Sequence, residues 1–238
     1  AISGLQTLTR GYVNVAGQLT AVDSYFNLAG LTYTTAVMGA VGVNFYQAQY
    51  GYDADGRRSR RQTGNGTIYR TVYDGLSRVV SDWVGTNDTP TSGEWSPTNN
   101  TAPSNMVQVS ALQYDGGGVG DGNLTQATAY PGGAAAARVT QNWYDWRDRL
   151  VATKSGVQAS ENDGTNRPIL VTTYDNLDEV TQTQQYSGDG VTPVIANGVL
   201  QPLNSSLLRA QAATGYDDQG RVYQTQVFDV SPTTGAVS

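Results

Sequence analysis

The side chains that could do chemistry in this sequence are carboxylates, arginines and phenols, because the chain has neither histidine nor cysteine. Those two residue types supply the commonest general bases, nucleophiles and transition-metal ligands. A pair of carboxylates could still hydrolyse a glycosidic bond, so the placement of the aspartates matters most. Six of them directly follow a tyrosine, in the pairs Tyr52-Asp53, Tyr73-Asp74, Tyr114-Asp115, Tyr144-Asp145, Tyr174-Asp175 and Tyr216-Asp217.

The Tyr-Asp pairs belong to a longer internal repeat. Successive tyrosines are 21, 41, 30, 30 and 42 residues apart, and the two longest gaps predict a degenerate unit inside each. We expect further degenerate copies at 12–19, at 25–31 and at Phe228-Asp229. The residue five positions after the tyrosine is an arginine in four copies and a glutamate in a fifth: Arg57, Arg78, Arg149, Arg221 and Glu179.

Each unit has the pattern of a β-hairpin. The residues before the tyrosine alternate, as in 69–73, which predicts a strand. The aspartate can cap a tight turn by accepting backbone N–H groups, and Gly56 and Gly220 provide a flexible turn position. A single hairpin is marginal in water. The predicted fold class is therefore all-β, with repeated antiparallel β-hairpins forming an extended, curved or spiralling sheet.

These residues resemble the YD-repeat family, also called Rhs repeats, whose pattern is roughly Tyr-Asp-x-x-Gly-Arg-Leu. The best matches are 52–57 and 216–222, and the resemblance covers about residues 45 to 230. The family includes bacterial Rhs proteins, the cocoon components of insecticidal Tc toxins, and animal teneurins. The resemblance implies a long antiparallel sheet that closes into a hollow shell. The irregular spacing departs from the family, and the Rhs core ending that precedes a toxin domain has no counterpart here.

Composition narrows the function classes. The 238-residue chain carries a net charge of −6, and Lys154 is its single lysine, so it lacks the basic patch that nucleic acid requires. Its apolar stretch at 36–43 is far short of the ~20 residues of a membrane helix, which predicts no membrane insertion. We expect the arginines at 57–61 to form a solvated strand. Because the chain opens with Ala1, we expect a processed product or a segment of a longer polypeptide.

The predicted organisation is an N-terminal degenerate repeat or assembly segment at 1–44, followed by a YD-repeat sheet domain at 45–238 with loop insertions near 86–106 and 187–214. Because the repeat aspartates have a structural task, we predict no catalytic residue, no cofactor site and no enzyme activity. Calcium is the one metal that the oxygen-rich segments 53–56 and 115–121 could bind, but they lack the ligand spacing of an EF-hand loop. Turn formation is the favoured interpretation of both segments.

The leading hypothesis is a structural protein at the bacterial cell surface or outside the cell, which self-assembles through its sheet edges into a fibre or shell. Its partners would be copies of itself or flanking parts of a longer chain. One alternative is a fragment of an Rhs-type toxin-encapsulating shell. Another is a carbohydrate-binding or adhesive module using the four tryptophans. Glycans are a further candidate partner, because five Asn-x-Ser/Thr sequons are present as candidate glycosylation sites, at Asn65, Asn87, Asn99, Asn123 and Asn204.

Overall fold

The computed structural model describes residues 7–238, which fall into two compact units divided between Ser110 and Ala111. Apart from three short 3-10 turns, the regular structure in this range is all strand. The strands are β1 (Leu8–Val13), β2 (Leu19–Tyr25), β3 (Phe45–Tyr52), β4 (Arg58–Gln62), β5 (Ile68–Tyr73), β6 (Val79–Gly85), β7 (Val107–Tyr114), β8 (Leu124–Ala129), β9 (Arg138–Tyr144), β10 (Leu150–Val157), β11 (Pro168–Tyr174), β12 (Val180–Ser187), β13 (Ile195–Ala196), β14 (Val199–Leu200), β15 (Leu208–Tyr216) and β16 (Val222–Phe228). The 3-10 turns are η1 (Pro97–Asn99), η2 (Asp115–Gly117) and η3 (Ser205–Leu207).

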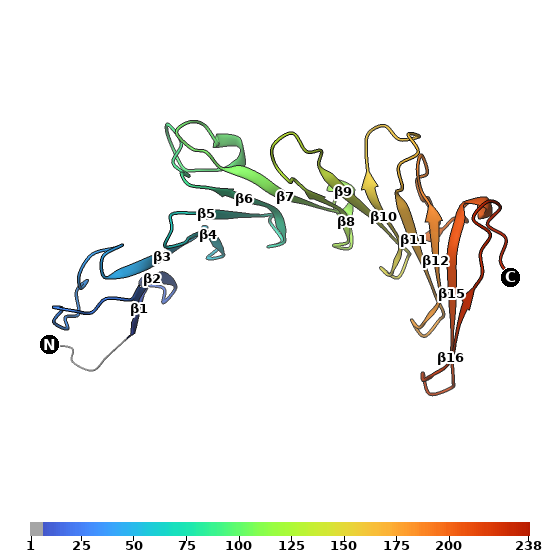
Figure 1. Ribbon diagram of the computed structural model, residues 1–238, viewed down its shortest axis with the longest axis horizontal. Helices are drawn as coiled ribbons and strands as arrows, with labels where there is room; N and C mark the ends of the chain where they lie inside the picture. Colours follow the sequence, from blue (N-terminus) through green and yellow to red (C-terminus); the bar gives the residue numbers. More distant parts are fainter. Residues whose placement is uncertain (1–6) are drawn as a thin grey trace. The chain divides into compact units, whose positions relative to one another are not determined.

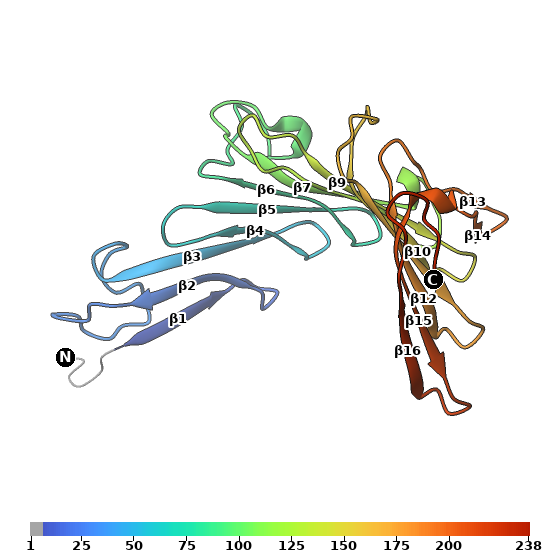
Figure 2. The same cartoon turned by 45° about the vertical axis from the view of Figure 1, so that its right-hand side comes forward.

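Fourteen of these strands form one sheet in chain order, from β1 through β12 to β15 and β16 (Figure 1). The strands β13 and β14 pair in a small sheet of their own (Figure 2). Neighbouring strands within each unit pair antiparallel, as β1–β2, β2–β3, β5–β6 and β11–β12 do. The sheet order has two ends, β1 and β16, so it is open rather than closed into a barrel. The all-β, repeated-hairpin fold class is confirmed. No helix in the described range is long and apolar enough to cross a membrane.

The connections between the sheet strands alternate between two kinds. Tight hairpins join β1–β2, β3–β4, β5–β6, β9–β10, β11–β12 and β15–β16, and a glycine-rich hairpin joins β7–β8. The intervening connections span 26–44, 63–67, 86–106, 130–137, 158–167 and 188–207, and all of them except the tight 63–67 hairpin are longer. Because neighbouring strands are antiparallel, the hairpins of each unit lie at one end of its strands, here called the turn end. The intervening connections lie at the opposite end, called the insert end (Figures 1 and 2).

The buried apolar clusters lie where an insert folds over one face of the sheet. In the first unit, Leu28 and Met38 of the 26–44 insert pack against Tyr25 and Phe45. In the second unit the cluster is larger. Its buried members are Ala152, Ile169, Val171, Tyr186 and Leu208, against which Leu200, Leu203 and Leu207 pack. Full burial of one such side chain stabilises the fold by about 1.5–3 kcal/mol. The inserts therefore supply the core that an uncovered sheet lacks.

The insert at 86–106 is attached to the sheet by charge and by aromatic contact. The Asp88 carboxylate forms ion pairs with Arg60 and Arg70, with a nitrogen–oxygen distance of 2.7 Å in each. The Arg70 guanidinium also lies 5.2 Å from the Trp95 ring centre. Burial raises the pKa of Asp88, but hydrogen bonds and charge from these two arginines outweigh it and hold that pKa below its usual value. The expectation of a merely solvated arginine strand is therefore wrong for Arg60.

Several expected repeat copies take other forms. Tyr25 ends β2 in a buried cluster instead of opening a turn, and Asp229 begins a tail whose backbone pairs with Ser238. The 41-residue gap holds the 86–106 insert in place of a further unit of the sheet. Within 187–214, β13 and β14 form a small hairpin, and the strand β15 already begins at Leu208.

Candidate functional site

Each tight hairpin at the turn end is built by its aspartate. In the Asp53 turn, the Asp53 backbone N–H donates to the Arg57 carbonyl at 2.9 Å, and the Gly56 N–H donates to the Asp53 carbonyl at 3.0 Å. The Asp53 carboxylate accepts the backbone N–H groups of Asp55 and Arg57, and its second oxygen accepts Arg57 Nε at 2.7 Å. This is a three-residue hairpin loop, a type I turn followed by a left-handed residue and a bulge. The arginine at the fixed offset closes it.

The same set of bonds recurs along both units. Asp74, Asp145 and Asp217 each accept two backbone N–H groups and the Nε of the arginine four residues later. Asp175 accepts the two N–H groups as well, but Glu179 occupies the arginine position. The register shifts by one residue at the tyrosine of each of these hairpins, as a bulge requires.

The fourth residue of each turn has a positive φ, which the glycine pattern reveals only in part. Gly56 and Gly220 have φ of 78° and 73°. In the other copies Ser77, Asp148 and Asp178 adopt φ between 59° and 66°. Aspartate enters the left-handed region more readily than most residues, which accounts for Asp148 and Asp178 but not for Ser77.

In five of the six Tyr-Asp pairs, the tyrosine reaches back to the hairpin before it. Its hydroxyl donates to the carbonyl of the residue that follows the closing position of the preceding turn. The bonds are Tyr52 to Leu19 at 2.8 Å, Tyr73 to Arg58 at 3.1 Å, Tyr144 to Leu124 at 3.0 Å, Tyr174 to Leu150 at 3.2 Å and Tyr216 to Val180 at 3.2 Å. Each of these tyrosines therefore joins its own hairpin to the preceding one.

The closing arginine reaches forward to the next hairpin. Arg149 Nη1 donates to the Asp175 carbonyl at 2.8 Å, and its guanidinium lies 5.0 Å from the Tyr174 ring centre. Arg57 does the same to the Asp74 carbonyl at 2.8 Å and to the Tyr73 ring at 4.9 Å. We call the backward tyrosine bond and the forward arginine contact together the turn joint. It comes in addition to the backbone ladder between the strands.

Two irregular turns keep a reduced form of the joint. Asn14 replaces the aspartate in the β1–β2 hairpin, and Gln18 at the arginine position donates to the Gly56 carbonyl at 3.1 Å. In the glycine-rich turn, Asp115 accepts the N–H groups of Gly122 and Asn123, and the Asn123 amide reaches Asp148 of the next turn at 2.8 Å. An amide can therefore make the forward contact where arginine is absent.

The electrostatics follow these contacts. Burial raises the pKa of Asp145, but hydrogen bonds from the Arg149 side chain and from the turn backbone outweigh it and keep that pKa below its usual value. The Arg221 side chain is the main cause of the lowered pKa of Asp217. The pKa of Glu179 shifts in the opposite direction. Burial raises it most, and the neighbouring carboxylates of Asp175 and Asp217 raise it further. One turn of the series is thus electrostatically unfavourable.

A buried ionic cluster at the insert end of the second unit has no counterpart in our sequence analysis. Lys154 is 2% exposed, and its Nζ donates to Glu161 at 2.5 Å and to the Val191 carbonyl at 2.6 Å. Arg167 pairs with Asp163 at 2.7 Å and with Asp189. These contacts tie the 158–167 insert to the 188–207 insert. The isolated lysine in the sequence was the one available signal, but its partners are too far along the chain to be identified.

The same unit has a cavity of about 340 Å³ between the sheet and the β13–β14 hairpin. Val171, Tyr186, Leu200 and Leu203 give it an apolar lining. The hairpin crosses the sheet face far enough for the Gly198 carbonyl to accept the Trp146 backbone N–H at 2.9 Å. An insert and a turn are therefore linked directly at this point.

The remaining predicted sites differ in their surroundings. The rings of Trp83 and Trp95 meet edge to face with their centres 5.7 Å apart, and Trp143 packs against the apolar cluster of the second unit. Trp146, in contrast, is 72% exposed. Among the sequons, the Nδ2 atoms of Asn99 and Asn123 donate hydrogen bonds within the chain, and the side-chain oxygens of Asn65, Asn87 and Asn204 accept backbone N–H groups. Glycosylation stays a prediction. So does calcium binding; among residues 7–238 no group of three or more acidic side chains is arranged as a metal site.

Comparisons with known proteins identify a fold. No family model matches the sequence, and no curated protein matches it. The crystal structure of TcdB2-TccC3-Cdc42 contains a chain similar to this one, with 13% identity, a TM-score of 0.52, and coverage of 91% of this chain and 9% of that chain. The crystal structure of TcdB2-TccC3 gives 14% identity, a TM-score of 0.52, and coverage of 90% and 9%. This chain thus spans about a tenth of the solved chains that it matches, and the likeness is consistent with a YD-type β-repeat fold.

Proposed function

We propose that this chain is a non-catalytic structural segment in the wall of an Rhs-type shell outside the cell. The observation that carries this proposal is the turn joint. Consecutive hairpins are held by a backward tyrosine bond and a forward arginine contact, as between the Asp145 and Asp175 turns. Such a joint fixes each hairpin to its neighbour, which is the property that a continuous wall needs.

The likeness to the TcdB2-TccC3 structures supports the shell over a self-assembling surface fibre. Those chains contain a region of the same fold that is one part of a much longer polypeptide. By this proposal the partners of the present sheet are further repeats of the wall. Self-assembly into fibres and glycan decoration stay predictions with no additional support from the fold.

The engagement of the repeat aspartates supports a structural role. A general acid or nucleophile must have a carboxylate oxygen free to meet its substrate. In the Asp53, Asp74, Asp145 and Asp217 turns, one carboxylate oxygen accepts two backbone N–H groups and the other accepts an arginine. Both oxygens are occupied in maintaining the turn.

Electron microscopy of the native protein that contains this segment tests the proposal. We expect closed, hollow particles whose wall contains this sheet, with further antiparallel strands paired to β1 and to β16. Fibres with one copy of this segment per axial repeat would overturn the proposal in favour of self-assembly. Particles in which both edges of this sheet face solvent would overturn it as well.

A further inference from the structure

The last turn of the series carries one half of a turn joint. Arg221 closes the Asp217 turn through its Nε at 2.8 Å, as the other arginines do. Its side chain is nevertheless 71% exposed, compared with 21% for Arg57 and 20% for Arg149, both of which reach a following turn. Within the described chain Arg221 has no following Tyr-Asp turn. Its Nε and Nη2 contact Asp217 of its own turn, and Nη1, the atom that makes the forward contact in Arg149, is left for a partner.

The strand beside Arg221 is also prepared for a neighbour. β16 pairs with β15 alone in the sheet order. Val222, Tyr223 and Val227 are each more than half exposed. An uncovered apolar edge strand is a template for pairing with another strand. In all five backward tyrosine bonds described above, the carbonyl that accepts the hydroxyl belongs to the residue directly after the closing position. The equivalent carbonyl here is that of Val222.

We propose that the β16 edge is a recognition site for one kind of partner, the first strand of another Tyr-Asp hairpin. The tyrosine of that hairpin donates to the Val222 carbonyl, and its aspartate carbonyl accepts Arg221 Nη1. The Arg221 guanidinium then lies over the incoming tyrosine ring, as Arg149 lies over Tyr174. This inference rests on the proposed wall function and adds the chemical identity of the next element.

A second copy of this chain fits the edge poorly. In a head-to-tail arrangement β16 would meet β1, whose hairpin has Val13 and Asn14 where the joint requires tyrosine and aspartate. Tyr12 cannot substitute, because its hydroxyl already donates to Asp23 at 2.7 Å. The β16 edge of one copy therefore cannot form a turn joint with the β1 edge of another copy. The occupant is a hairpin with an intact Tyr-Asp turn.

A tethered hairpin tests the proposal in the full-length chain. A second copy of residues 168–187, which carries Tyr174-Asp175, is joined after Ser238 by a flexible linker long enough to reach β16. Tethering matters because a free hairpin is marginal in water and a short linker gives an effective concentration near the millimolar range. The readout is amide hydrogen exchange of 222–228. We expect exchange at these residues to slow by about tenfold or more, which corresponds to a hairpin that is docked most of the time.

Three variants show whether the joint is specific. Arg221→Gln in the chain, or Tyr174→Phe in the appended hairpin only, should each reduce this protection about fivefold, the effect of one lost hydrogen bond. Arg209→Gln is the matched control, because the hydrogen bonds of the Arg209 side chain among residues 7–238 go to the nearby carbonyls of Ser206 and Leu208 at the insert end. That variant should leave the protection unchanged. Appending residues 8–25 instead should give little protection.

The outcomes separate this inference from the wall proposal. Equal protection by the Tyr174-containing hairpin and by residues 8–25 would overturn the inference and would favour docking of a second copy. If neither Arg221→Gln nor Tyr174→Phe changes the protection from exchange, the inference is overturned too, since β16 would then accept any strand. Neither result would alter the expected hollow particles, which test the wall proposal independently.

Discussion

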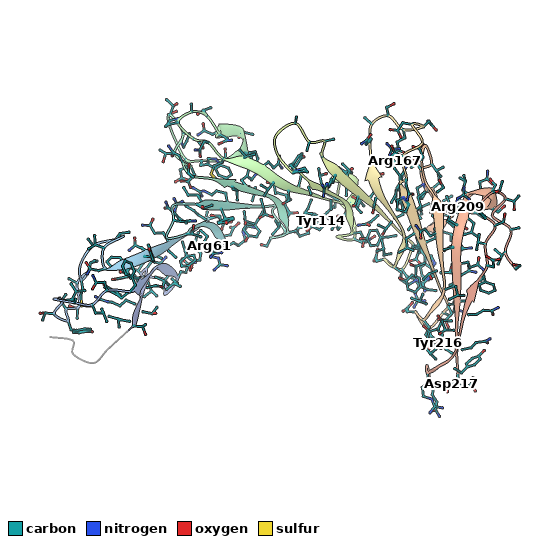
Figure 3. The ribbon with its side chains drawn as sticks, in the orientation of Figure 1. Arg61, Tyr114, Arg167, Arg209, Tyr216 and Asp217 are labelled. Carbon is teal, nitrogen blue, oxygen red and sulfur yellow. The ribbon has the colours of Figure 1, made fainter. Side chains whose placement is uncertain are left out.

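The two ends of the second unit are stabilised in different ways. At the turn end, Asp145 and Arg149 are four residues apart, with 7% and 20% of their side chains exposed, and their bonds are made within the turn or to the next turn. At the insert end, Lys154 reaches Val191 across 37 residues and is buried. Figure 3 shows Arg167 at the insert end and Tyr216 with Asp217 at the turn end of the same unit. The turn end is thus a local, repeatable device, whereas the insert end is a specific tertiary core.

Lys154→Met should have the largest effect, because it removes the only lysine cation beside the largely buried Glu161 carboxylate, which keeps the Gly190 and Gln158 N–H groups, and it removes the Lys154 donor to the Val191 carbonyl. We expect the free energy of unfolding to fall by about 3–5 kcal/mol, the usual cost of removing one partner of a buried ion pair. Chemical denaturation followed by tryptophan fluorescence measures it. The double variant Lys154→Met with Glu161→Gln should recover most of the loss. A loss below about 1 kcal/mol, typical of a surface ion pair, would remove the distinction between the two ends.

Asp145→Ala should have a smaller effect at the turn end, a loss of about 1–3 kcal/mol, since two backbone N–H groups and one guanidinium lose their acceptor. Asp145→Asn is the matched control: it keeps an oxygen for the backbone and removes the charge, so it should lose less. The measurement is the same denaturation curve. Equal losses in both variants would mean that the arginine contact, and not the backbone cap, stabilises the turn.

Tyr174→Phe isolates the backward bond of the joint. It removes the hydroxyl that donates to the Leu150 carbonyl but retains the ring beneath Arg149. The expected loss is about 0.5–1.5 kcal/mol. Tyr223→Phe is the control, because Tyr223 is largely exposed on β16. If both variants behave alike, the tyrosine bond contributes nothing beyond strand pairing.

The pH dependence should have opposite signs in two neighbouring turns. The lowered pKa of Asp145 contributes stability that is present above about pH 3.9, its unfolded pKa, and is lost as the pH falls through the folded value. The raised pKa of Glu179 contributes stability that is present below about pH 4.3 and is lost as the pH rises through its folded value. Glu179→Gln should therefore be more stable than the parent chain at pH 7, with the difference vanishing near pH 4. Denaturation midpoints across this range measure it, and a constant difference would contradict the assignment.

Glu179→Arg should give the smallest effect, an increase of the melting temperature by about 1–4 °C. The substitution restores the closing residue of the Asp175 turn and replaces a carboxylate that lies near Asp217. Glu179→Gln separates relief of repulsion from restoration of the joint, so the arginine variant should melt higher than the glutamine variant. A melting temperature at or below that of the glutamine variant would show that this position cannot host the joint.

The sequence predicts the turn end well because its information is local. The Tyr-Asp pairs, the arginine at a fixed offset and the alternation before each tyrosine all lie within one hairpin. The sequence does not indicate the positive φ of Ser77 and Asp148, because glycine is the one residue type that marks this conformation clearly. In the degenerate copy at 12–19, Asn14 takes the aspartate's place, two residues after Tyr12 instead of one.

The insert end was not predictable in the same way. No periodicity connects Lys154 with Glu161 or Arg167 with Asp189, and both pairs depend on how two inserts fold over the sheet. The partners of Asp88 are likewise set by strand pairing, since Arg60 and Arg70 lie opposite each other on β4 and β5. Contacts of this kind require the register of the sheet, which a single sequence does not specify.

The turn joint has a direction, and this affects how the protein is made. Arg57 and Arg149 reach the hairpin that follows, and five of the repeat tyrosines reach the one before. During synthesis, a finished hairpin therefore offers its arginine and its carbonyl before the next tyrosine has been translated. Every new hairpin finds its docking site already present on its immediate predecessor, so the sheet can grow by successive nearest-neighbour steps. The ribosome would then deliver the repeats in the order in which they assemble.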